Sequence, residues 1–570
     1  MGIPYYFSHI IKQHRDIIIE KSSLSNIENL YLDANSIIYD QLNIKTFQCK
    51  NEVSLDDYIE EFENTLICSI IEKIYEYIDI VKPSKRVFVA FDGVAPIAKL
   101  SQQRNRRYKA SFQKTFLSSK EKKGTIDTWD HASITPGTNF MKKLSRALLS
   151  EFHANPPSDV VDDLYIWTST SKTPGEGEHK IFEYIRREKK YHRETNTFIY
   201  GLDSDLFMLA LNHSHQSNYK LYLYRETPVF IKSLDETLEP NKSYAIDIPL
   251  LAIQIHKMMA SHHTSASLKA RGSMWQEKPN ESLLYDYIFL CFLLGNDFVA
   301  KTPSLNIRMH GLDHIIRGYQ RTAALLHGNQ SKVSNRFHLI KCISDEQIEI
   351  HWNHVKYLIS TLAELEHDRL IKIHTQRTQP YVYREHENTI EHKLLCIPMT
   401  HQNTERRINP SKIGWGSRYY NELFDFEESN DDAIKKCCLN YFESLEWTMK
   451  YYTHGCPDWH WKYSYEYAPL LNDMVRYIPC FDKGFISKNM NEPIHELMLL
   501  AYVTPKASIK RLLPGRLYEI IFKGHPEWYM DDCKFRWAYC RYFWECHAVM
   551  NEIDLKELSS YIHMYLENVT

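Results

Sequence analysis

The chain has 570 residues, which is too many for one hydrophobic core and predicts roughly two to four domains. Its composition is 43% hydrophobic and 25% charged, which argues against a mostly disordered chain. The formal net charge is only −3, so overall charge gives no sign of a polyanionic partner, and any site for one has to be local.

The twelve cysteines and the N-terminal residues bear on where the protein works. No CxxC pair and no zinc-type quartet occurs, so we expect free thiols in a reducing compartment. The first residues, MGIPYYFSHI, lack a signal-peptide pattern, and the longest apolar run, 287–294, is too short to span a bilayer. We therefore predict a soluble intracellular protein without membrane contact. A cytoplasmic location is favoured and a nuclear one is left open.

Three short β-rich segments end at acidic residues in the first half of the chain. LYLDANSII leads to Asp33, RVFVAFDG leads to Asp92, and TFIYGLDSD leads to Asp203 and Asp205. Helical patterns separate them, for example at 56–81. Strands that alternate with helices predict an α/β fold with a mostly parallel sheet and flanking helices. Ligands bind outside the carboxyl ends of such strands, which is where these aspartates would lie.

A fourth apolar run and two polar stretches follow. The run YIFLCFLLGND reaches Asp297, and its pattern leaves helix and strand both open. Residues 261–282 are typical of a surface loop, and residues 401–418 separate a helical middle from an aromatic-rich C-terminal part. We place a domain boundary near 330–345.

The stretch PGEGEHKI, residues 174–181, places two glutamates on either side of Gly177. By itself this pattern is typical of a helix start, where glutamates are favoured by the helix dipole. With the strand-end aspartates, however, it gives seven carboxylates at one sheet edge, which would repel one another unless cations were bound. The seven are Asp33, Asp92, Glu176, Glu178, Asp203, Asp205 and Asp297.

Oxygen-only ligands are those that Mg²⁺ or Mn²⁺ prefers. Two such ions about 3.5–4 Å apart can stabilise both the attacking and the leaving oxygen in phosphodiester cleavage. Gly177 would let the backbone approach this cluster with no side chain in the way. We therefore predict that the seven carboxylates are both metal ligands and catalytic residues.

Residues 99–123 form a strongly basic segment with nine Lys or Arg residues and one acid. A helix that begins near Pro96 would place four of its polar side chains on one face, suited to holding a phosphate. A solvated basic helix is the alternative, but a start four residues after a strand-end aspartate favours a role in substrate binding. The four are Lys99, Gln103, Arg106 and Arg107.

Residues 451–469, YYTHGCPDWHWKYSYEYAP, are too polar and too rich in Gly and Pro for a core helix. A ring from this segment could stack on a base, which contributes about 1–3 kcal/mol per base. Packing between domains is an equally good interpretation for most of these rings.

Taken together, these motifs resemble the XRN-type 5′→3′ exoribonucleases. They run in that family's order from residue 1 to about residue 560. The matching stretches are MGIPYYF, LYLDANSII, FDGVAPIAKLSQQRNRR, SITPGTNFM, PGEGEHKI, YGLDSDL, LLGNDF followed by PSLNIR, and GCPDWHWKYSYEYAP.

The resemblance implies a PIN-like nuclease domain, related to flap endonucleases, at residues 1–335. It implies a helical connector at 336–425 and a second mixed helical, aromatic-rich region at 426–570 that encloses the active site. The implied activity is hydrolysis of single-stranded RNA with a 5′-monophosphate to mononucleotides, by a monomer that uses two Mg²⁺ or Mn²⁺ ions. The resemblance does not name protein partners.

Carried over by position, the seven carboxylates become metal-site acids, and the four residues of the basic face become the grip on the 5′-phosphate. Such a pocket would exclude a cap or triphosphate by size. For base stacking the resemblance points to Tyr39 and to one of Trp459 or Trp461. Two departures stand out: the family often has histidine at the position of Tyr39, and Ile97 replaces a usual arginine.

Two other functions would use many of the same residues. A flap-type structure-specific DNA nuclease would share the acids, but the glycine-rich helix-hairpin-helix expected after Asp297 is missing from GNDFVAKTPSLNIRMHGLDHII. A catalytically inactive RNA-binding scaffold would tend to lose buried acids that are costly without metals, yet all seven are present.

Overall fold

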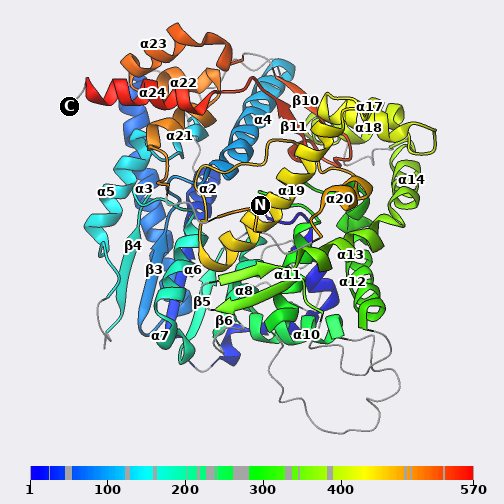
Figure 1. Ribbon diagram of the computed structural model, residues 1–570. Helices are drawn as coiled ribbons and strands as arrows, with labels where there is room; N and C mark the ends of the chain where they lie inside the picture. The colour runs from blue at the N-terminus through cyan, green and yellow to red at the C-terminus, as the bar shows by residue number, and fades with distance from the viewer. Residues whose placement is uncertain are drawn as a thin grey trace.

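Figure 1 shows the computed structural model of the chain, coloured from the N- to the C-terminus. It describes residues 2–24, 26–44, 54–121, 129–157, 163–201, 203–214, 219–225, 238–239, 242–260, 281–327, 337–344, 347–381, 389–480, 484–487, 491–530 and 533–568. Residues 261–280 of the expected surface loop lie outside this described part.

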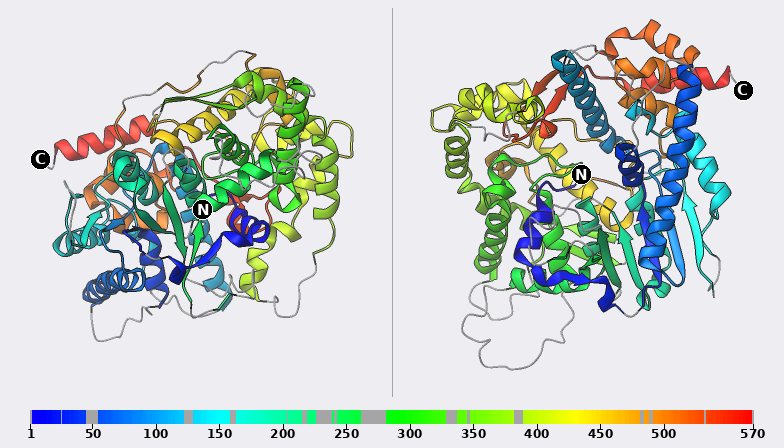
Figure 2. Two further views of the ribbon diagram at one scale, coloured as in Figure 1. Left: turned by 90° about the horizontal axis from the view of Figure 1, so that it is seen from below. Right: turned by 180° about the vertical axis from the view of Figure 1, so that it is seen from behind.

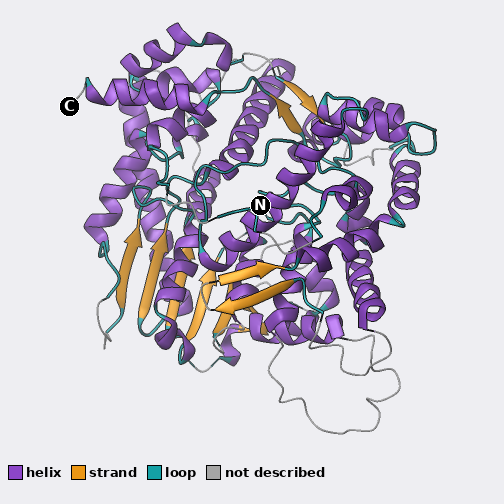
Figure 3. Ribbon diagram, viewed as in Figure 1, coloured by secondary structure: helices purple, strands orange, loops and turns teal. Residues whose placement is uncertain are grey.

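A seven-stranded sheet organises the N-terminal half, in the order β1-β7-β6-β5-β2-β3-β4 (Figure 3). The five strands from β6 to β4 are parallel to their neighbours, while β7 and β1 pair antiparallel at the other edge. This confirms the predicted α/β fold with a mostly parallel sheet. The strands are β1 Ile18–Glu20, β2 Asn29–Asp33, β3 Arg86–Ala90, β4 Tyr165–Ser169, β5 Asn196–Tyr200, β6 Lys220–Arg225 and β7 Tyr244–Asp247.

Helices cover both faces of the sheet, so the central strands are apolar on both sides. In β2, Leu30 and Leu32 pack into the core beneath α2, α3 and α5, whereas Tyr31 between them packs into the core beneath α6, α8, α10 and α11. The helices of this half are α1 Tyr6–Gln13, α2 Asn35–Ile44, α3 Leu55–Val81, α4 Ile97–Glu121, α5 Asn139–Glu151, α6 Gly177–Arg187, α7 Lys189–Arg193, α8 Asp205–Ser214, α10 Ile248–Ala260, α11 Glu281–Phe292 and α12 Gly311–His327.

The helices expected at 56–81 and after Pro96 are present as α3 and α4. The fourth apolar run, which the sequence left open, is the helix α11. Its residues 285–292 are all buried, so no polar face marks a helical period. That is why its pattern did not distinguish a helix from a strand.

The second half is mostly helical. The 24-residue helix α19 crosses the middle of the molecule in front of the sheet (Figure 1), and the C-terminal helices gather at the end where α4 lies (Figures 1 and 2). The elements are β8 Ile340–Ser344, β9 Gln347–Ile350, α13 Trp352–Ala363, α14 Glu366–Arg377, α15 Ile390–Leu395, α16 Ile397–Thr400, α17 Asn403–Ile408, α18 Trp415–Phe424, α19 Asp431–His454, α20 Leu471–Tyr477, α21 Glu496–Val503, α22 Lys506–Leu512, α23 Gly515–Gly524, β10 Lys534–Arg536, β11 His547–Val549 and α24 Leu555–Glu567.

Helix α4 is held by this C-terminal part. Its apolar start, including Ile97 and Leu100, packs in one core with α21, α23 and α24. Further along, the Arg104 guanidinium donates to the carbonyls of Asn551 at 2.9 Å and Trp528 at 3.0 Å. The basic helix is therefore a fixed wall between the sheet and the C-terminal helices. The predicted domain boundaries stay a prediction.

Two further expectations concern the whole chain. Every cysteine in the described ranges is a free thiol, as predicted. Among the helices that the structure describes, none combines the length and the apolar character needed to cross a membrane.

Candidate active site

Four of the seven predicted carboxylates follow the carboxyl ends of strands, and the other three lie at the start of α6 or in the loop after α11. Three parallel strands deliver most of them, since β2, β3 and β5 end side by side. Each acid is within electrostatic reach of others in the set. Their places are Asp33 at the end of β2, Asp92 after β3, Glu176 and Glu178 at the start of α6, Asp203 and Asp205 after β5, and Asp297 after α11.

Gly177 is required by the close approach of α6 to the strand ends. A Cβ at this position would lie 2.6 Å from Asp33 Oδ1 and 2.9 Å from the Ala90 carbonyl oxygen. The Gly177 N–H donates to Asp92 Oδ1 at 2.7 Å. Glu176 is the N-cap residue of α6, but its side chain makes no capping hydrogen bond. The Glu-Gly-Glu turn thus starts α6 and also packs directly against Asp33 and Asp92 at the strand ends.

Burial and mutual repulsion shift several of these acids toward the neutral form. Burial, and then the nearby Asp92, Asp203 and Glu176 carboxylates, raise the pKa of Asp33 well above its usual value. The same two causes raise the pKa of Glu178, and they bring the pKa of Asp205 to about 6. The ionised forms of these carboxyl groups therefore need positive charge nearby to be stable together.

Lys99 supplies part of that charge. Its ammonium lies 2.5 Å from Glu176 Oε1 and 2.8 Å from Asp297 Oδ2, and the side chain is buried. Burial alone would raise the pKa of Asp297, but the Lys99 ammonium holds it below its ordinary value. Lys99, predicted for the phosphate grip, thus lies within the acid cluster at the inner end of the basic face.

The donor set fits hard divalent cations in kind. It offers carboxylate oxygens only, and Glu178 Oε2 is buried without a hydrogen-bond partner. Within the described ranges, no group of three or more His, Cys, Asp or Glu side chains is arranged so that it could hold one metal ion. The ammonium of Lys99 lies between two of the acids, so metal ions and Lys99 would compete for Glu176 and Asp297.

Several polar side chains that the sequence analysis did not single out contact the acids. The Tyr451 and Tyr452 hydroxyls, from α19, donate to Glu176 Oε2 at 3.0 Å and to Asp205 Oδ1 at 2.7 Å. Two amides do the same: Gln102 donates to Asp297 Oδ1 at 3.0 Å, and Asn35 donates to Asp92. The two tyrosines are the first residues of the aromatic segment 451–469, and this segment is the feature of the sequence that could have pointed to them.

The rest of the predicted phosphate grip continues outward along α4. Arg107 donates to the carbonyls of Ala132 and Ile134, both at 3.4 Å, which ties α4 to the segment SITPGTNFM. Burial lowers the pKa of Arg107, and Tyr39 makes the largest of the electrostatic contributions that raise it. Gln103 is half-buried and Arg106 is exposed. Tyr39 is 38% exposed and is an electrostatic neighbour of Arg107.

The two candidate tryptophans have different surroundings. Trp461 stacks on Trp447 with ring centroids 5.4 Å apart, and its indole N–H donates to Glu443 at 3.2 Å. The half-buried Trp459 has no stacked ring among the residues that the structure describes. Its carbonyl accepts from the Ile97 N–H at 2.9 Å, which places it at the start of α4. Of the two rings, Trp459 is thus the one without a stacked partner among the described residues.

A cavity of about 590 Å³ adjoins the acids Asp203 and Asp297 on the face of α4 that carries Gln102. Its size suits a ligand of one or a few nucleotides. Several aromatic side chains are among its lining residues, including Tyr463 and Trp544. Asp203 and Asp297 belong to the predicted metal-site set, so the cavity adjoins the predicted reaction centre.

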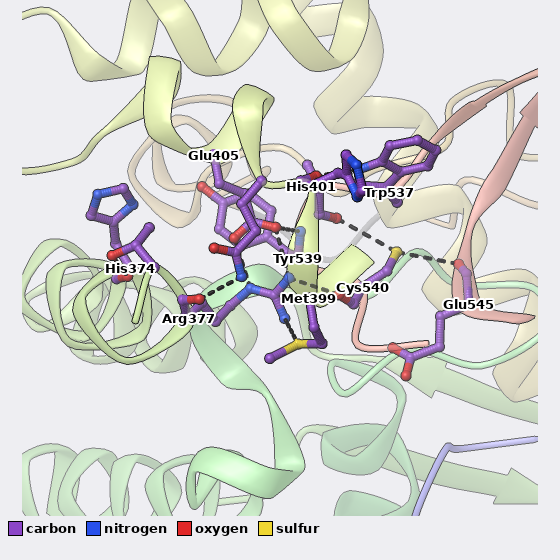
Figure 4. Close-up of polar contacts among 12 residues, drawn as sticks. His374, Arg377, Met399, His401, Glu405, Trp537, Tyr539, Cys540 and Glu545 are labelled. Carbon is purple, nitrogen blue, oxygen red and sulfur yellow. Dashed lines mark hydrogen bonds and ion pairs between the residues drawn. The ribbon is translucent and has the colours of Figure 1, made fainter. Parts of the chain in front are cut away.

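Figure 4 shows the polar contacts that hold one wall of this cavity, the loop that contains Tyr539 and Cys540. Arg377, from α14, forms a two-pronged pair with Glu405 at 2.7 Å for both contacts and also donates to the Cys540 carbonyl at 2.7 Å. Glu405 in turn accepts from the Tyr539 N–H at 2.8 Å. Trp537 anchors the start of the same loop by donating to the His401 carbonyl at 2.6 Å.

Comparison with known proteins agrees with this geometry. Residues 1–227 match the family model described as XRN 5′-3′ exonuclease N-terminus. Residues 278–407 and 382–558 match the model described as Xrn1 helical domain. The chain belongs to the XRN 5′-3′ exonuclease family. The XRN resemblance and the α/β nuclease fold predicted from the sequence are thereby confirmed.

Similar XRN proteins come from fungi and animals. The chain is 24% identical over its whole length to 5′-3′ exoribonuclease 1 of Saccharomyces cerevisiae, and 28% identical over 98% of its length to 5′-3′ exoribonuclease 1 of Homo sapiens. It is 24% identical over its whole length to the 5′-3′ exoribonuclease 2 homolog of Drosophila melanogaster. The alignments cover 44%, 34% and 72% of these relatives, so the chain spans less than half the length of the first two.

Proposed function

We propose that this XRN chain is a 5′→3′ exoribonuclease that hydrolyses single-stranded RNA with a 5′-monophosphate to mononucleotides. The observation that carries the proposal is the oxygen-only group of seven buried or half-buried carboxylates, which meets the basic face of α4 at Lys99. The names of its relatives, 5′-3′ exoribonucleases 1 and 2, support RNA as the substrate.

The carboxylates would hold two Mg²⁺ or Mn²⁺ ions, and bound ions of this kind stabilise the attacking and leaving oxygens in phosphodiester hydrolysis. The chain's own part is to bind and orient. Asp33, Glu178 and Asp205, whose raised pKa values mark a demand for positive charge, favour cation binding. Lys99 keeps Glu176 and Asp297 neutralised until ions or substrate arrive.

Substrate binding would divide between the 5′-phosphate and the bases. Arg106 and Arg107 are the forked donors of the grip, and Gln103 and Lys99 extend it toward the acids. Tyr39, an electrostatic neighbour of Arg107, is the ring that we propose to stack on the base attached to a gripped phosphate. Trp459, with no ring partner among the described residues, is the second stacking ring that we propose. The ring-lined cavity beside Asp203 suits unpaired nucleotides better than a duplex.

We also infer a cytoplasmic protein that acts as a monomer. The free thiols of all the described cysteines support a reducing compartment. Membership in the XRN family is compatible with either location, since the relatives carry both the type 1 and the type 2 name.

The test is digestion of three matched single-stranded RNAs that carry a 5′-monophosphate, a 5′-triphosphate or a 5′-hydroxyl, beside the 5′-monophosphate DNA. Each is incubated with Mg²⁺ and with EDTA. Asp203→Ala removes one acid of the cluster, and Asp79→Ala, at an exposed position of α3, is the matched control.

We expect mononucleotides from the monophosphate RNA alone, lost with EDTA and with Asp203→Ala but kept with Asp79→Ala. Equal cleavage of the RNAs with all three 5′ ends would contradict the proposed recognition of the 5′-monophosphate. Cutting of DNA flaps alone would point to a flap-type nuclease. RNA binding without any cutting would leave an inactive scaffold.

A further inference from the structure

Two consecutive tyrosines of α19 reach two different acids of the XRN site. The Tyr451 hydroxyl donates to Glu176 Oε2 at 3.0 Å, and the Tyr452 hydroxyl donates to Asp205 Oδ1 at 2.7 Å. Both pairs are buried and join residues far apart in the chain, by 275 and 247 positions. A single turn of one helix in the second half thus contacts acids that come from two separate elements, α6 and α8.

Both hydroxyls are committed donors. The Tyr451 hydroxyl gives its proton to the bond with Glu176 and the Tyr452 hydroxyl to the bond with Asp205, because an ionised carboxylate can only accept. A carboxylate that accepts such a bond is restricted in its rotation about the last side-chain torsion. Each bond therefore occupies one carboxylate oxygen and fixes where the other oxygen can point.

The surroundings hold the two rings in place. The Tyr451 ring stacks on His179 at a centroid distance of 3.7 Å and packs on Trp447 at 4.8 Å. The Tyr452 ring meets Phe292, of α11, edge-on at 5.3 Å. Both tyrosines are almost fully buried, with exposed fractions of 2% and 0%. Side chains locked by packing in this way are suited to orienting a ligand.

We infer that Tyr451 and Tyr452 are positioning residues that orient Glu176 and Asp205 for cation binding, so that the second half of the chain completes the metal site of the first. This inference rests on the proposed function for its choice of cation. Loss of a hydrogen bond to a metal-binding carboxylate typically costs about 10–100-fold in metal affinity or activity. We expect each Tyr→Phe change to fall in that range.

The matched control lies on the same helix. Tyr441 is as buried as the doublet, and its hydroxyl bonds to Thr302 Oγ1 at 3.2 Å and to the Ala300 carbonyl at 3.3 Å. These partners are no part of the acid cluster. Tyr441→Phe therefore removes the same atom from the same helix and leaves the acids untouched.

The experiment titrates Mn²⁺ into the full-length chain and into Tyr451→Phe, Tyr452→Phe and Tyr441→Phe, following free Mn²⁺ by electron paramagnetic resonance. Unfolding of each protein in EDTA measures the purely structural cost. We expect the Mn²⁺ dissociation constant to rise roughly 10-fold or more for the first two variants and to stay within about two-fold for Tyr441→Phe. In cleavage assays below metal saturation, kcat should fall while KM for RNA stays.

Two results would overturn the inference. One is a wild-type Mn²⁺ affinity in Tyr451→Phe and Tyr452→Phe. The other is a loss of Mn²⁺ affinity in Tyr441→Phe equal to theirs, which would make the effect structural. The titration needs no RNA cleavage, so the proposed nuclease can fail separately: weakened Mn²⁺ binding in both variants of a protein that cuts no RNA supports the positioning role and rejects the exoribonuclease.

Discussion

Replacing Gly177 by alanine tests whether the Glu-Gly-Glu turn is built for the acid cluster. The new Cβ would lie 2.6 Å from Asp33 Oδ1 and 2.9 Å from the carbonyl oxygen of Ala90, whereas ordinary contact begins at 3.4 Å. Ala90 ends a central strand and is fully buried, so its backbone has no room to yield. The start of α6 must therefore move away by several tenths of an ångström, and it takes Glu176 and Glu178 with it.

Overpacking of this kind costs about 1–3 kcal/mol of unfolding free energy. Displacing catalytic groups by about 1 Å can cost on the order of 10²-fold in rate. We therefore expect Gly177→Ala to lower stability moderately and the release of mononucleotides from 5′-monophosphate RNA severely. Urea unfolding gives the first quantity, and initial rates at saturating Mg²⁺ give the second.

The control is Gly515→Ala, at the first position of α23, where an added Cβ would meet nothing within 4 Å. This change should leave the rate unaltered and should stabilise the chain slightly, by about 0.4–1 kcal/mol, because it restricts the unfolded state. A Gly177→Ala protein with the rate and the stability of the wild type would refute the close-approach argument.

Three further outcomes follow from the structure. Burial and a neighbouring carboxylate raise the pKa of Asp205 from 3.8 to about 6, so between these pH values the folded protein binds more protons than the unfolded chain. The contribution of Asp205 to the unfolding free energy in EDTA should therefore fall as pH rises from about 4 to about 6. Asp205→Asn should remove this fall in urea titrations. Trp459→Ala should weaken RNA binding by about 1–3 kcal/mol in fluorescence titrations, with little change in the unfolding free energy. Trp461→Ala removes a ring that stacks on Trp447, so it should mainly lower the unfolding free energy. The reverse pattern would exchange the roles of the two tryptophans. Arg377→Ala removes one partner of a buried two-pronged pair and should cost about 3 kcal/mol of unfolding free energy, while the control Arg321→Ala, at an exposed pair, should cost under about 1 kcal/mol. Equal losses would contradict the role of Arg377 in holding the cavity wall of Figure 4.

Short sequence motifs were sufficient to predict those elements that depend only on residues close together in the chain. The strand ends at Asp33 and Asp92 follow from short apolar runs that stop at an acid, and α4 follows from Pro96 and a polar helical stretch. The glycine of the Glu-Gly-Glu turn was also correctly interpreted, because a close approach is a common reason for glycine at a turn between acids. These features need only the order of residue types along a few turns or one strand.

Tertiary structure alone decided the rest. The helical state of α11 was hidden because all its faces are buried, which removes the polar positions that reveal a period. Lys99 was predicted as a phosphate ligand, but its ammonium pairs with Glu176 and Asp297, an arrangement that depends on how α4 packs against the sheet.

The tyrosine doublet of α19 shows the limit most clearly. The aromatic segment that begins at Tyr451 and Tyr452 is visible in the sequence, but it does not indicate which acids the two hydroxyls contact. Their hydroxyls find Glu176 and Asp205 across 275 and 247 residues of chain, and the partner of a buried donor is set by packing and not by neighbours in sequence. The sequence by itself therefore determined which acids gather near the carboxyl ends of the strands, and only the folded chain decided which side chains hold those acids in place.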